Sequence, residues 1–390
     1  MIGRARSAIT VPGGALKLTM FAPSMTWGGA EKMFRRLAIG FVQRGLSVDL
    51  VLASATGPNL EDLPSTVQVV DLEADRVRDA IRPLARYIDE ARPDALLSTL
   101  YYANLAAVVA RSLAKWSPVL ILREATSLSV GAVHPASSRH RMMLSLVRLL
   151  YPRADLVVAN SHGAARDLVD EVGIPRAMVR VIYNPAYAED TAAMMQETVG
   201  HPWFRDEGPP IVLSVGRLNL PKGHDLLIRA VCAARRHRPM RLVILGDGEE
   251  RARLEAVVRE CDAAEFVSLP GFAANPYAYM ARSDLFVLSS IWEGLPNVLI
   301  EALGCGLRVV STDCPHGPRE ILDMSGPGRG AYGTLAPCGD VDGLCEAILG
   351  ELGTRRDPAA LRGRAMRFGL DRAVDSYLDL IRFDRPRRTA

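Results

Sequence analysis

Two glutamates at a fixed spacing are the residues of this sequence best placed to do chemistry. Glu293 and Glu301 are separated by seven residues in the stretch SSIWEGLPNVLIEALGCG, residues 289–306. The stretch is typical of a buried strand end, a tight turn and a helix that begins near a proline. Helical side chains lean toward the N-terminus, so Glu301 is expected to point at the turn that carries Glu293. Carboxylates beside free helix amides suit a polyol attached to a phosphate, although a capped helix with incidental acids shows the same spacing.

A pair of cations gives a second candidate for a binding site. Arg217 and Lys222 lie in the stretch GRLNLPKG, flanked by Gly216 and Gly223, directly after an expected strand. The planar fork of an arginine and the point charge of a lysine can converge on one diphosphate. On these residues alone, a charged surface loop is an equally good interpretation.

The elements that would position these residues alternate between strands and helices along the whole chain. This pattern is typical of parallel sheets with helices on both faces, so the expected fold class is α/β with two doubly wound, Rossmann-like domains. A cleft between the two domains, which face each other, is the expected place for a ligand. The expected strands are 16–22, 47–53, 67–72, 95–99, 119–123, 156–160 and 179–183, then 211–216, 242–246, 265–270, 284–289 and 308–312. Helices are expected in the first half at 30–44, 75–91, 104–115, 138–150 and 163–172.

Two strand ends in the first half carry further candidates, because ligands of such sheets bind beyond the carboxyl ends of the strands. After the first strand, Gly28 and Gly29 precede a helix that carries Glu31, so the backbone can approach a ligand closely. The loop is not G-x-G-x-x-G, which disfavours an NAD-dependent enzyme. After the fifth strand, Glu124 is either a weak base for an acceptor hydroxyl or the partner of a neighbouring arginine.

The segment 139–153 combines apolar and basic residues at helical spacing. Its apolar side is expected to be core, whereas Arg141 and Arg148 are expected to face either the diphosphate of a lipid-linked acceptor or solvent. The apolar residues concerned are Met142, Met143, Leu146, Leu149 and Leu150.

Composition excludes several classes of protein. With 390 residues, 49% of them apolar and 23% charged, the chain resembles an ordinary globular protein of two domains. A net charge of +3 does not favour nucleic acid as a partner, although arginine clusters at 139–153 and 382–388 allow a peripheral contact with an anionic membrane. Six cysteines without C-x-x-C spacing, and the lack of a signal-like start or a long apolar run, indicate a cytoplasmic location.

The order G-R-x-x-x-x-K-G and then E-x7-E resembles the signature of retaining glycosyltransferases of family 4, which have the GT-B fold. The stretch CPHGPREIL, residues 314–322, is similar to a subgroup that adds hexoses or N-acetylhexosamines to lipid-linked or cell-surface glycans. The resemblance covers about residues 16–380. It implies a flexible tail at 1–15, an acceptor-side domain at 16–185, a linker at 186–209 and a nucleotide-sugar domain at 210–368. A helix at 369–384 is expected to return to the first domain.

The resemblance also implies roles for individual residues. The donor is expected to be a UDP-linked sugar, and Glu293, Arg217 and Lys222 are expected to be catalytic. No metal or other cofactor is expected, because Asp340 in D-V-D reads as a helix N-cap rather than as a metal ligand. The expected donor-binding residues are Gly28, Gly29, Gly216, Arg217, Lys222, Gly271, Phe272, Gly294, Leu295, Asn297 and Glu301, and the expected acceptor residues are Glu31, Glu124, Arg141 and Arg148.

Two other functions fit the same residues. A GT-B epimerase or phosphorylase would bind the same donor but release a free or phosphorylated sugar. A non-catalytic partner would bind the nucleotide sugar without turnover.

Overall fold

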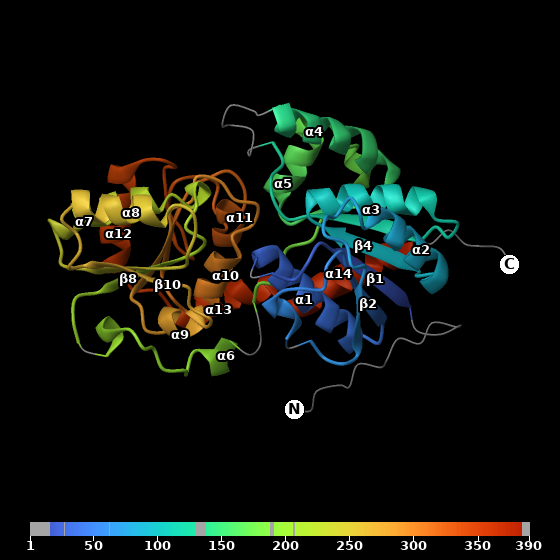
Figure 1. Ribbon diagram of the computed structural model, residues 1–390. Coiled ribbons are helices and arrows are strands. Elements are labelled where there is room, and N and C mark those ends of the chain that lie inside the picture. The colour runs from blue at the N-terminus through green and yellow to red at the C-terminus, as the bar shows by residue number, and fades with distance from the viewer. Residues whose placement is uncertain are drawn as a thin grey trace. The chain divides into compact units, whose positions relative to one another are not determined.

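The computed structural model describes residues 16–26, 28–61, 63–129, 138–187, 191–205 and 207–383. The predicted N-terminal tail, 1–15, lies outside the described residues, as does the last residue of the predicted C-terminal helix. The chain folds into two compact units (Figure 1). The first comprises Met1–Pro185 and Leu370–Ala390, and the second comprises Ala186–Gly369.

The first unit is built on a parallel sheet. Over the described residues it has seven strands in the order β3-β2-β1-β4-β5-β6-β7. Each strand predicted for this half is confirmed to within two residues, because central parallel strands are buried on both faces and so read as continuous apolar runs. The strands are β1 Lys17–Ala22, β2 Ser47–Leu52, β3 Val67–Asp71, β4 Ala95–Thr99, β5 Val119–Glu124, β6 Leu156–Ala159 and β7 Val179–Val181.

Helices cover both faces of this sheet through separate apolar cores (Figure 1). One core joins the sheet to α2 (Ile81–Ala91), α3 (Tyr101–Leu113), α4 (Ser138–Leu150) and α5 (His162–Arg166). The other joins it to α1 (Gly29–Gln43) and to α14 (Leu370–Phe383) from the end of the chain. Gly40 allows α1 and α14 to pack closely, since a Cβ there would lie 2.6 Å from Val374 Cγ2.

Three helices of the first unit differ from the sequence prediction. The first, α3, begins at Tyr101 rather than at residue 104. Residues 75–80 form turns, and α2 begins only at Ile81. The expected helix 163–172 is interrupted after Arg166, where a π-helical turn, Asp167–Glu171, follows α5. The buried Asp167 carboxylate accepts hydrogen bonds from the amides of Leu128 (3.0 Å) and Ser129 (3.2 Å), so this irregular turn supports the loop that follows β5.

The second unit repeats this architecture. Within its described residues the strand order is β10-β9-β8-β11-β12-β14-β13, and every neighbouring pair except β13 with β14 is parallel. The five predicted strands are confirmed, whereas the short hairpin of β13 and β14 was not predicted. The bounds are β8 Ile211–Val215, β9 Arg241–Leu245, β10 Val267–Gly271, β11 Leu285–Leu288, β12 Val309–Thr312, β13 Gly328–Arg329 and β14 Thr334–Ala336.

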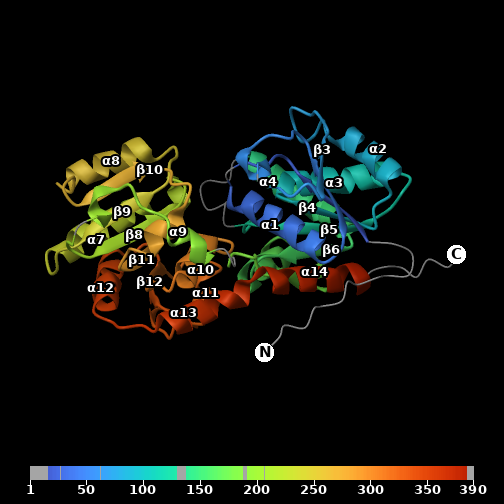
Figure 2. The same ribbon diagram turned by 90° about the horizontal axis from the view of Figure 1, so that it is seen from below.

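The helices of the second unit follow its strands in turn. On one face of the sheet, α7 packs against both α8 and α12 over a common apolar core (Figure 2). Near the ends of the strands, α10 contacts α9, α11 and α13. The helices are α6 Thr191–Met194, α7 His224–Arg235, α8 Arg251–Glu260, α9 Pro276–Met280, α10 Asn297–Gly304, α11 Pro318–Leu322, α12 Val341–Leu352 and α13 Pro358–Ala365.

The segment interpreted as a linker, 186–209, packs on the second unit. Asn275 Nδ2 donates to the Met194 carbonyl at 2.8 Å, and an Arg282 nitrogen donates to the Met195 carbonyl at 2.9 Å. The ring of His201 contacts Ser268 Oγ at 3.0 Å. These contacts attach the start of the segment to α9 and its middle to β10.

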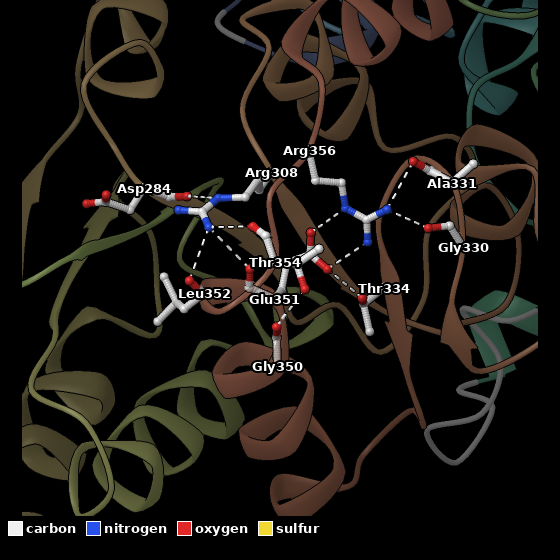
Figure 3. A network of polar contacts seen from close by, with 10 residues as sticks. All are labelled: Asp284, Arg308, Gly330, Ala331, Thr334, Gly350, Glu351, Leu352, Thr354 and Arg356. Carbon is white, nitrogen blue, oxygen red and sulfur yellow. Dashed lines mark hydrogen bonds and ion pairs between the residues drawn. The ribbon is translucent and has the colours of Figure 1, made fainter.

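A buried polar network fixes the end of α12 (Figure 3). Both carboxylate oxygens of Glu351 accept from Arg356, at 2.6 and 2.8 Å, and Oε2 also accepts from Thr334 Oγ1 at 2.7 Å. Arg308 caps the helix by donating to the carbonyls of residues 351, 352 and 354, and its Nε donates to the Asp284 carbonyl. The network therefore ties α12 to β14 and to the strands at the centre of the sheet.

No helix in the described part of the chain is both long enough and apolar enough to cross a bilayer.

Candidate functional site

Three loops of the second unit meet at one edge of its sheet. β8, β11 and β12 are parallel neighbours, so the loops that follow them emerge at the same edge. The first loop carries Arg217 and Lys222, the second carries Glu293, and the third contains the CPHGPRE sequence. This edge is where an open parallel sheet binds its ligand.

An ion pair joins the first two loops. Lys222 Nζ lies 2.6 Å from Glu293 Oε1, and Ser290 Oγ donates to the same oxygen at 2.7 Å. The two side chains are 22% and 13% exposed, so the pair is partly shielded but open to water. Among the described residues, Glu293 Oε2 accepts no hydrogen bond, and Lys222 Nζ has one partner for its three protons. Both groups therefore keep hydrogen-bonding capacity for a polar ligand.

The backbone around Lys222 is held tightly against the neighbouring strand. Gly223 has a φ of +57°, and a Cβ there would lie 2.3 Å from the Ser289 carbonyl. Ser289 Oγ in turn donates to the Lys222 carbonyl at 2.8 Å. Gly216 faces the lysine stem, since its Cβ would lie 3.4 Å from Lys222 Cε. Glycine is required at position 223, whereas a Cβ at position 216 would only touch the lysine stem at an ordinary contact distance.

The third loop supports the turn that carries Glu293. The Glu293 amide donates to the Pro315 carbonyl at 3.2 Å. Gly317 has a φ of +91°, and a Cβ there would lie 2.4 Å from Pro296 Cδ and 3.1 Å from the Gly294 carbonyl. The HGP sequence, residues 316–318, thus packs against the residues just before α10 and supports them. Its glycine is required by both its backbone conformation and its surroundings.

Arg217 lies apart from the pair of Lys222 and Glu293. Its guanidinium is exposed and pairs with Glu249, with nitrogen to oxygen distances of 3.0 and 3.1 Å. The expected convergence of Arg217 and Lys222 is therefore not formed in this conformation, because Glu249 in the loop before α8 attracts the arginine. An exposed pair of this kind contributes little stability and exchanges partners easily.

The turn Gly246-Asp247-Gly248 holds the Arg217 loop in place. Gly216 and Leu218 donate their amides to the carbonyls of Leu245 and Asp247, each at 2.9 Å. A Cβ at Gly246 would lie 1.9 Å from the Gly216 carbonyl. This turn lets the ends of β8 and β9 approach each other closely.

The second glutamate of the spaced pair is more deeply buried than the first. Glu301 lies on α10 and accepts from the Tyr277 hydroxyl at 2.9 Å. Gly294 and the buried Leu295 form the turn before this helix, Pro296 is its N-cap, and Asn297 is its first residue. The tyrosine on α9 orients the carboxylate of Glu301, a contact that no sequence spacing indicates.

Two expected donor-binding residues lie at the end of β10. Gly271 has a φ of +98°, and its carbonyl accepts from the Gly246 amide at 2.8 Å. Phe272 is largely exposed. The contribution of both residues to donor binding stays a prediction.

Arg319 is hydrogen-bonded to the residue that follows β12. Its guanidinium makes two hydrogen bonds of 2.6 Å to the carboxylate of Asp313, which raises the pKa of the arginine. The side chain therefore fastens the start of α11 to the end of β12. Asp340 is the N-cap of α12, as predicted, since its carboxylate accepts from the amides of Asp342 (3.1 Å) and Gly343 (3.0 Å).

In the first unit, the Gly28-Gly29 loop is covered by its own acid. Gly28 is the N-cap of α1, Gly29 is its first residue, and Glu31 lies in its first turn. A Cβ at Gly28 would lie 2.0 Å from Glu31 Oε2, and Thr26 Oγ1 donates to Glu31 Oε1 at 3.3 Å. A carboxylate already lies over this helix start, so a diphosphate would have to displace it.

Glu124 is buried, which differs from both interpretations of it. It is 1% exposed, and its Oε1 accepts from Asn104 Nδ2 at 2.8 Å and from the Tyr151 hydroxyl. Burial raises the pKa of Glu124 to about 7, although both hydrogen bonds and the nearby charge of Arg123 oppose the shift. The carboxylate faces these two side chains, and among the residues that the structure describes it forms no direct ion pair.

The two arginines of α4 differ from each other. Arg148 donates to the carbonyls of Val172 (2.9 Å) and Glu171 (3.0 Å), so it caps the π-helical turn after α5. Arg141 is exposed. The expected core on the apolar side of α4 is wrong in part, because Met142, Leu146 and Leu149 are also exposed.

Sequence reasoning missed the partners of the candidate residues rather than the residues themselves. The candidate residues contact Ser290, Glu249 and Tyr277, and Arg319 of the CPHGPREIL stretch contacts Asp313. Ser290 lies three positions before Glu293, so a turn at this point was a usable signal for it. For the other three, only the order of the strands brings the partners together.

In the residues that the structure describes, no group of three or more His, Cys, Asp or Glu side chains is arranged to hold a metal ion.

Comparisons with known proteins concern the family of the chain and its fold. Residues 27–189 match the model of Glycosyltransferase Family 4, and residues 209–352 match that of Glycosyl transferases group 1. Anabaena HepE, solved in complex with UDP, superposes with a TM-score of 0.75 at 21% identity, covering 94% of this chain and all of that one. This likeness confirms the fold, an α/β architecture of two units of the GT-B type.

Two curated relatives are more similar in sequence. One, from Campylobacter jejuni, is N-acetylgalactosamine-N,N'-diacetylbacillosaminyl-diphospho-undecaprenol 4-alpha-N-acetylgalactosaminyltransferase. It is 41% identical over 177 residues, which cover 45% of this chain and 46% of the relative. The other, the lipopolysaccharide core biosynthesis glycosyltransferase LpsE of Rhizobium meliloti, is 31% identical over 240 residues, covering 60% and 66%. The chain thus spans between about half and two thirds of the length of these relatives.

Proposed function

We propose that this chain, which carries a glycosyltransferase family 4 domain followed by a glycosyl transferases group 1 domain, is a retaining glycosyltransferase. It would move a hexose or an N-acetylhexosamine from a nucleotide diphosphate sugar, with UDP as the nucleotide, to a lipid-linked glycan. The observation that carries the proposal is the pair of Lys222 and Glu293, 2.6 Å apart at the ligand-binding edge of the second sheet. A cation and an acid in one place suit a diphosphate joined to a polyol.

The chemical step breaks the bond between C1 of the sugar and the diphosphate oxygen. Negative charge then develops on the diphosphate, and Lys222 stabilises it together with the backbone amides at the start of α10. Arg217 would leave the exposed Glu249 and join Lys222 when the diphosphate binds. These groups act electrostatically, so the proposal includes no metal ion and predicts that transfer continues in the presence of a chelator.

The two glutamates would recognise hydroxyl groups. Glu293 Oε1 is held by Lys222 and Ser290, which leaves Oε2 for the sugar. Glu301 is held by Tyr277 and would accept from the ribose. The acceptor hydroxyl would attack C1 on the face that the leaving group occupies, and its proton would pass to the leaving phosphate. This route needs no enzyme nucleophile, unlike the double displacement of retaining glycosidases.

The class of acceptor rests on the relatives. The Campylobacter jejuni relative is named for a diphospho-undecaprenol acceptor, and the Rhizobium meliloti relative for lipopolysaccharide core biosynthesis. Both names indicate glycans built on lipids. We infer that this chain serves polysaccharide or glycoconjugate biosynthesis in the cytoplasm, at the inner face of the membrane.

Calorimetric titration with nucleoside diphosphates tests the proposal. UDP should bind more tightly than GDP or ADP, and Lys222→Ala should weaken UDP binding about tenfold or more, since it removes a charged contact to the diphosphate. Lys115→Ala, a change of an exposed lysine just after α3 of the first unit, is the control and should leave the affinity unchanged. UDP affinity that survives Lys222→Ala would contradict the proposed site.

A further inference from the structure

Two cysteines follow neighbouring strands at the ligand-binding edge of the second sheet. In the parallel pair of β12 and β14, the last partners in register are Thr312 and Ala336. The Asp313 amide continues the ladder by donating to the Ala336 carbonyl at 2.7 Å. Cys314 and Cys338 each follow these partners by two residues. The register therefore places the two cysteines at equivalent positions of adjacent chain segments.

The contacts of the two thiols bring their side chains to one place. Cys338 Sγ donates to the carbonyls of Ser290 at 3.8 Å and Ile291 at 3.6 Å. Thr312 Oγ1 donates to the same Ser290 carbonyl, and the Cys314 thiol contacts the Thr312 side chain. Both thiols thus gather around one hydroxyl and one carbonyl.

The two cysteines differ in their access to solvent. Cys314 is 3% exposed, whereas Cys338 is exposed. Adjacent strands lie about 4.8 Å apart, and a disulfide joins Cα atoms that are about 4.4 to 6.8 Å apart. An exposed thiol in front of a buried one is the arrangement of a cysteine that reacts first and a cysteine that resolves the product.

We propose that Cys314 and Cys338 are a redox pair, and that a disulfide between them prevents donor binding. The oxidant is a small disulfide such as oxidised glutathione. The Cys338 thiolate attacks one of its sulfur atoms, and one glutathione leaves and takes up the proton that Cys338 lost. Cys314 then attacks the Cys338 sulfur, and the second glutathione leaves with the proton of Cys314. Two protein thiols are thereby oxidised, and one glutathione disulfide is reduced to two thiols.

The surroundings of the thiols make this exchange slow. Burial raises the pKa of both cysteines, and the negative charge of Glu293 raises that of Cys314 further. Asp313 acts in the same way on Cys338. Thiolates are therefore scarce near neutral pH. A pair of this kind stays reduced in a reducing compartment and is oxidised only when oxidant accumulates.

The disulfide would act on the turn that carries Glu293. The Glu293 amide donates to the carbonyl of Pro315, the residue after Cys314. The Cys338 thiol donates to the two carbonyls of residues 290 and 291, just before Glu293. A bond between the cysteines removes the thiol donor and displaces the chain at Cys314, so the turn loses support from both sides. The effect on the donor rests on the proposed function, whereas formation of the disulfide does not.

Cys232 and Cys261 are a second neighbouring pair and provide a control. Burial, followed by the charge of Cys261, raises the pKa of Cys232 to about 12, and both residues pack on the core below α7 and α8. Cys232 lies in the last turns of α7, and Cys261 follows the end of α8. These helices lead the chain away from the ligand-binding edge, so a disulfide here would not reach the Glu293 turn.

Treatment of the full chain with oxidised glutathione, and then with dithiothreitol, tests the proposal. Tandem mass spectrometry should find Cys314 joined to Cys338 after oxidation. Amide hydrogen exchange of residues 289–296, which needs no ligand, should rise on oxidation and return on reduction. Calorimetry should show that oxidation weakens UDP binding about tenfold or more and that reduction restores it.

Two variants separate this pair from the other cysteines. Cys338→Ser should show no change in hydrogen exchange or UDP affinity on oxidation. Cys261→Ser, the matched control, should respond as the wild type does. Each variant is compared with itself before and after oxidation, so a constant effect of the substitution does not alter the result.

Four results would overturn the proposal. They are oxidised wild type without the bond between Cys314 and Cys338, that bond with unchanged hydrogen exchange, that bond with unchanged UDP affinity, and a Cys338→Ser variant that still responds. A reduced chain that does not bind UDP would instead contradict the proposed function. Hydrogen exchange would still show in that case whether the disulfide moves the Glu293 turn.

Discussion

Two ion pairs of the second unit have similar distances and different surroundings. Glu351 with Arg356 and Glu293 with Lys222 both approach to 2.6 Å. Glu351 and Arg356 are 0% and 8% exposed, and both carboxylate oxygens are occupied (Figure 3). Glu293 and Lys222 are open to water, and Glu293 uses one oxygen for both of its described partners.

The difference separates a structural pair from a binding pair. A buried pair must satisfy every polar atom, because an unpaired buried group destabilises the fold. A ligand site must retain groups that are supported but not saturated. By this criterion the network of Glu351 is structural, and the pair of Glu293 and Lys222 is available to a ligand.

The largest expected effect is on stability. Arg356→Met should lower the free energy of unfolding by about 3 to 5 kcal/mol, because it leaves the fully buried Glu351 without its cation. Lys222→Met, the matched control, should change it by less than about 1 kcal/mol, since water and Ser290 remain near Glu293. Urea denaturation of both variants measures the two values. Equal losses would remove the distinction between the pairs.

Glu124 extends the comparison to a buried acid that has no ion-pair partner among the described residues. The pKa of Glu124 is raised to about 7 by burial, whereas in the unfolded chain the carboxyl has its ordinary pKa. As the pH rises, the unfolded chain therefore loses this proton before the folded protein does. The stabilisation that Glu124 contributes is present below about pH 4.5 and is lost as the pH rises to about 7. The free energy of unfolding should fall by roughly 3 kcal/mol over this range.

Glu124→Gln should remove that dependence. Urea unfolding at the two ends of the pH range, for the variant and the wild type, measures it. If the difference in free energy of unfolding between the wild type and Glu124→Gln instead rises with pH, Glu124 is ionised in the folded protein.

The smallest expected effect concerns the exposed pair of Arg217 and Glu249. If Glu249 holds Arg217 only until a diphosphate binds, Glu249→Ala should tighten UDP binding by a factor of up to about five. Arg217→Ala should weaken it. Calorimetry on both variants decides between this exchange and a fixed surface pair, for which Glu249→Ala would leave the affinity unchanged.

Much of the fold was predictable because its strands are buried on both faces. Parallel strands such as β4 and β5 form short apolar runs. These runs can be recognised as strands because helical segments separate them. The hairpin of β13 and β14 was missed because its strands are two and three residues long and lie among glycines. The exposure of Met142, Leu146 and Leu149 on α4 was missed because apolar residues cover more than half of the circumference of that helix. Periodicity therefore could not tell the core side from the exposed apolar side.

For the candidate site, the sequence indicated the types of residue better than their contacts. Lys222 and Glu293 were predicted to act together, and the order of the strands brings them together. Arg217 was expected to join them, but a competing acid from another loop holds it. Glu124 was expected either to act on an acceptor hydroxyl or to pair with an arginine, but its hydrogen-bond partners are Asn104 and Tyr151. Each difference depends on a residue that is distant in sequence, which spacing alone does not reveal.

The most direct test of the account is the transfer rate of Glu293→Gln, measured with UDP-sugars and a lipid-linked acceptor, with urea unfolding of the same sample. The substitution keeps the size of the side chain and removes its charge. The account predicts that transfer falls about a hundredfold to a thousandfold while the free energy of unfolding changes by less than about 1 kcal/mol. A variant that transfers sugar at close to the wild-type rate would contradict it.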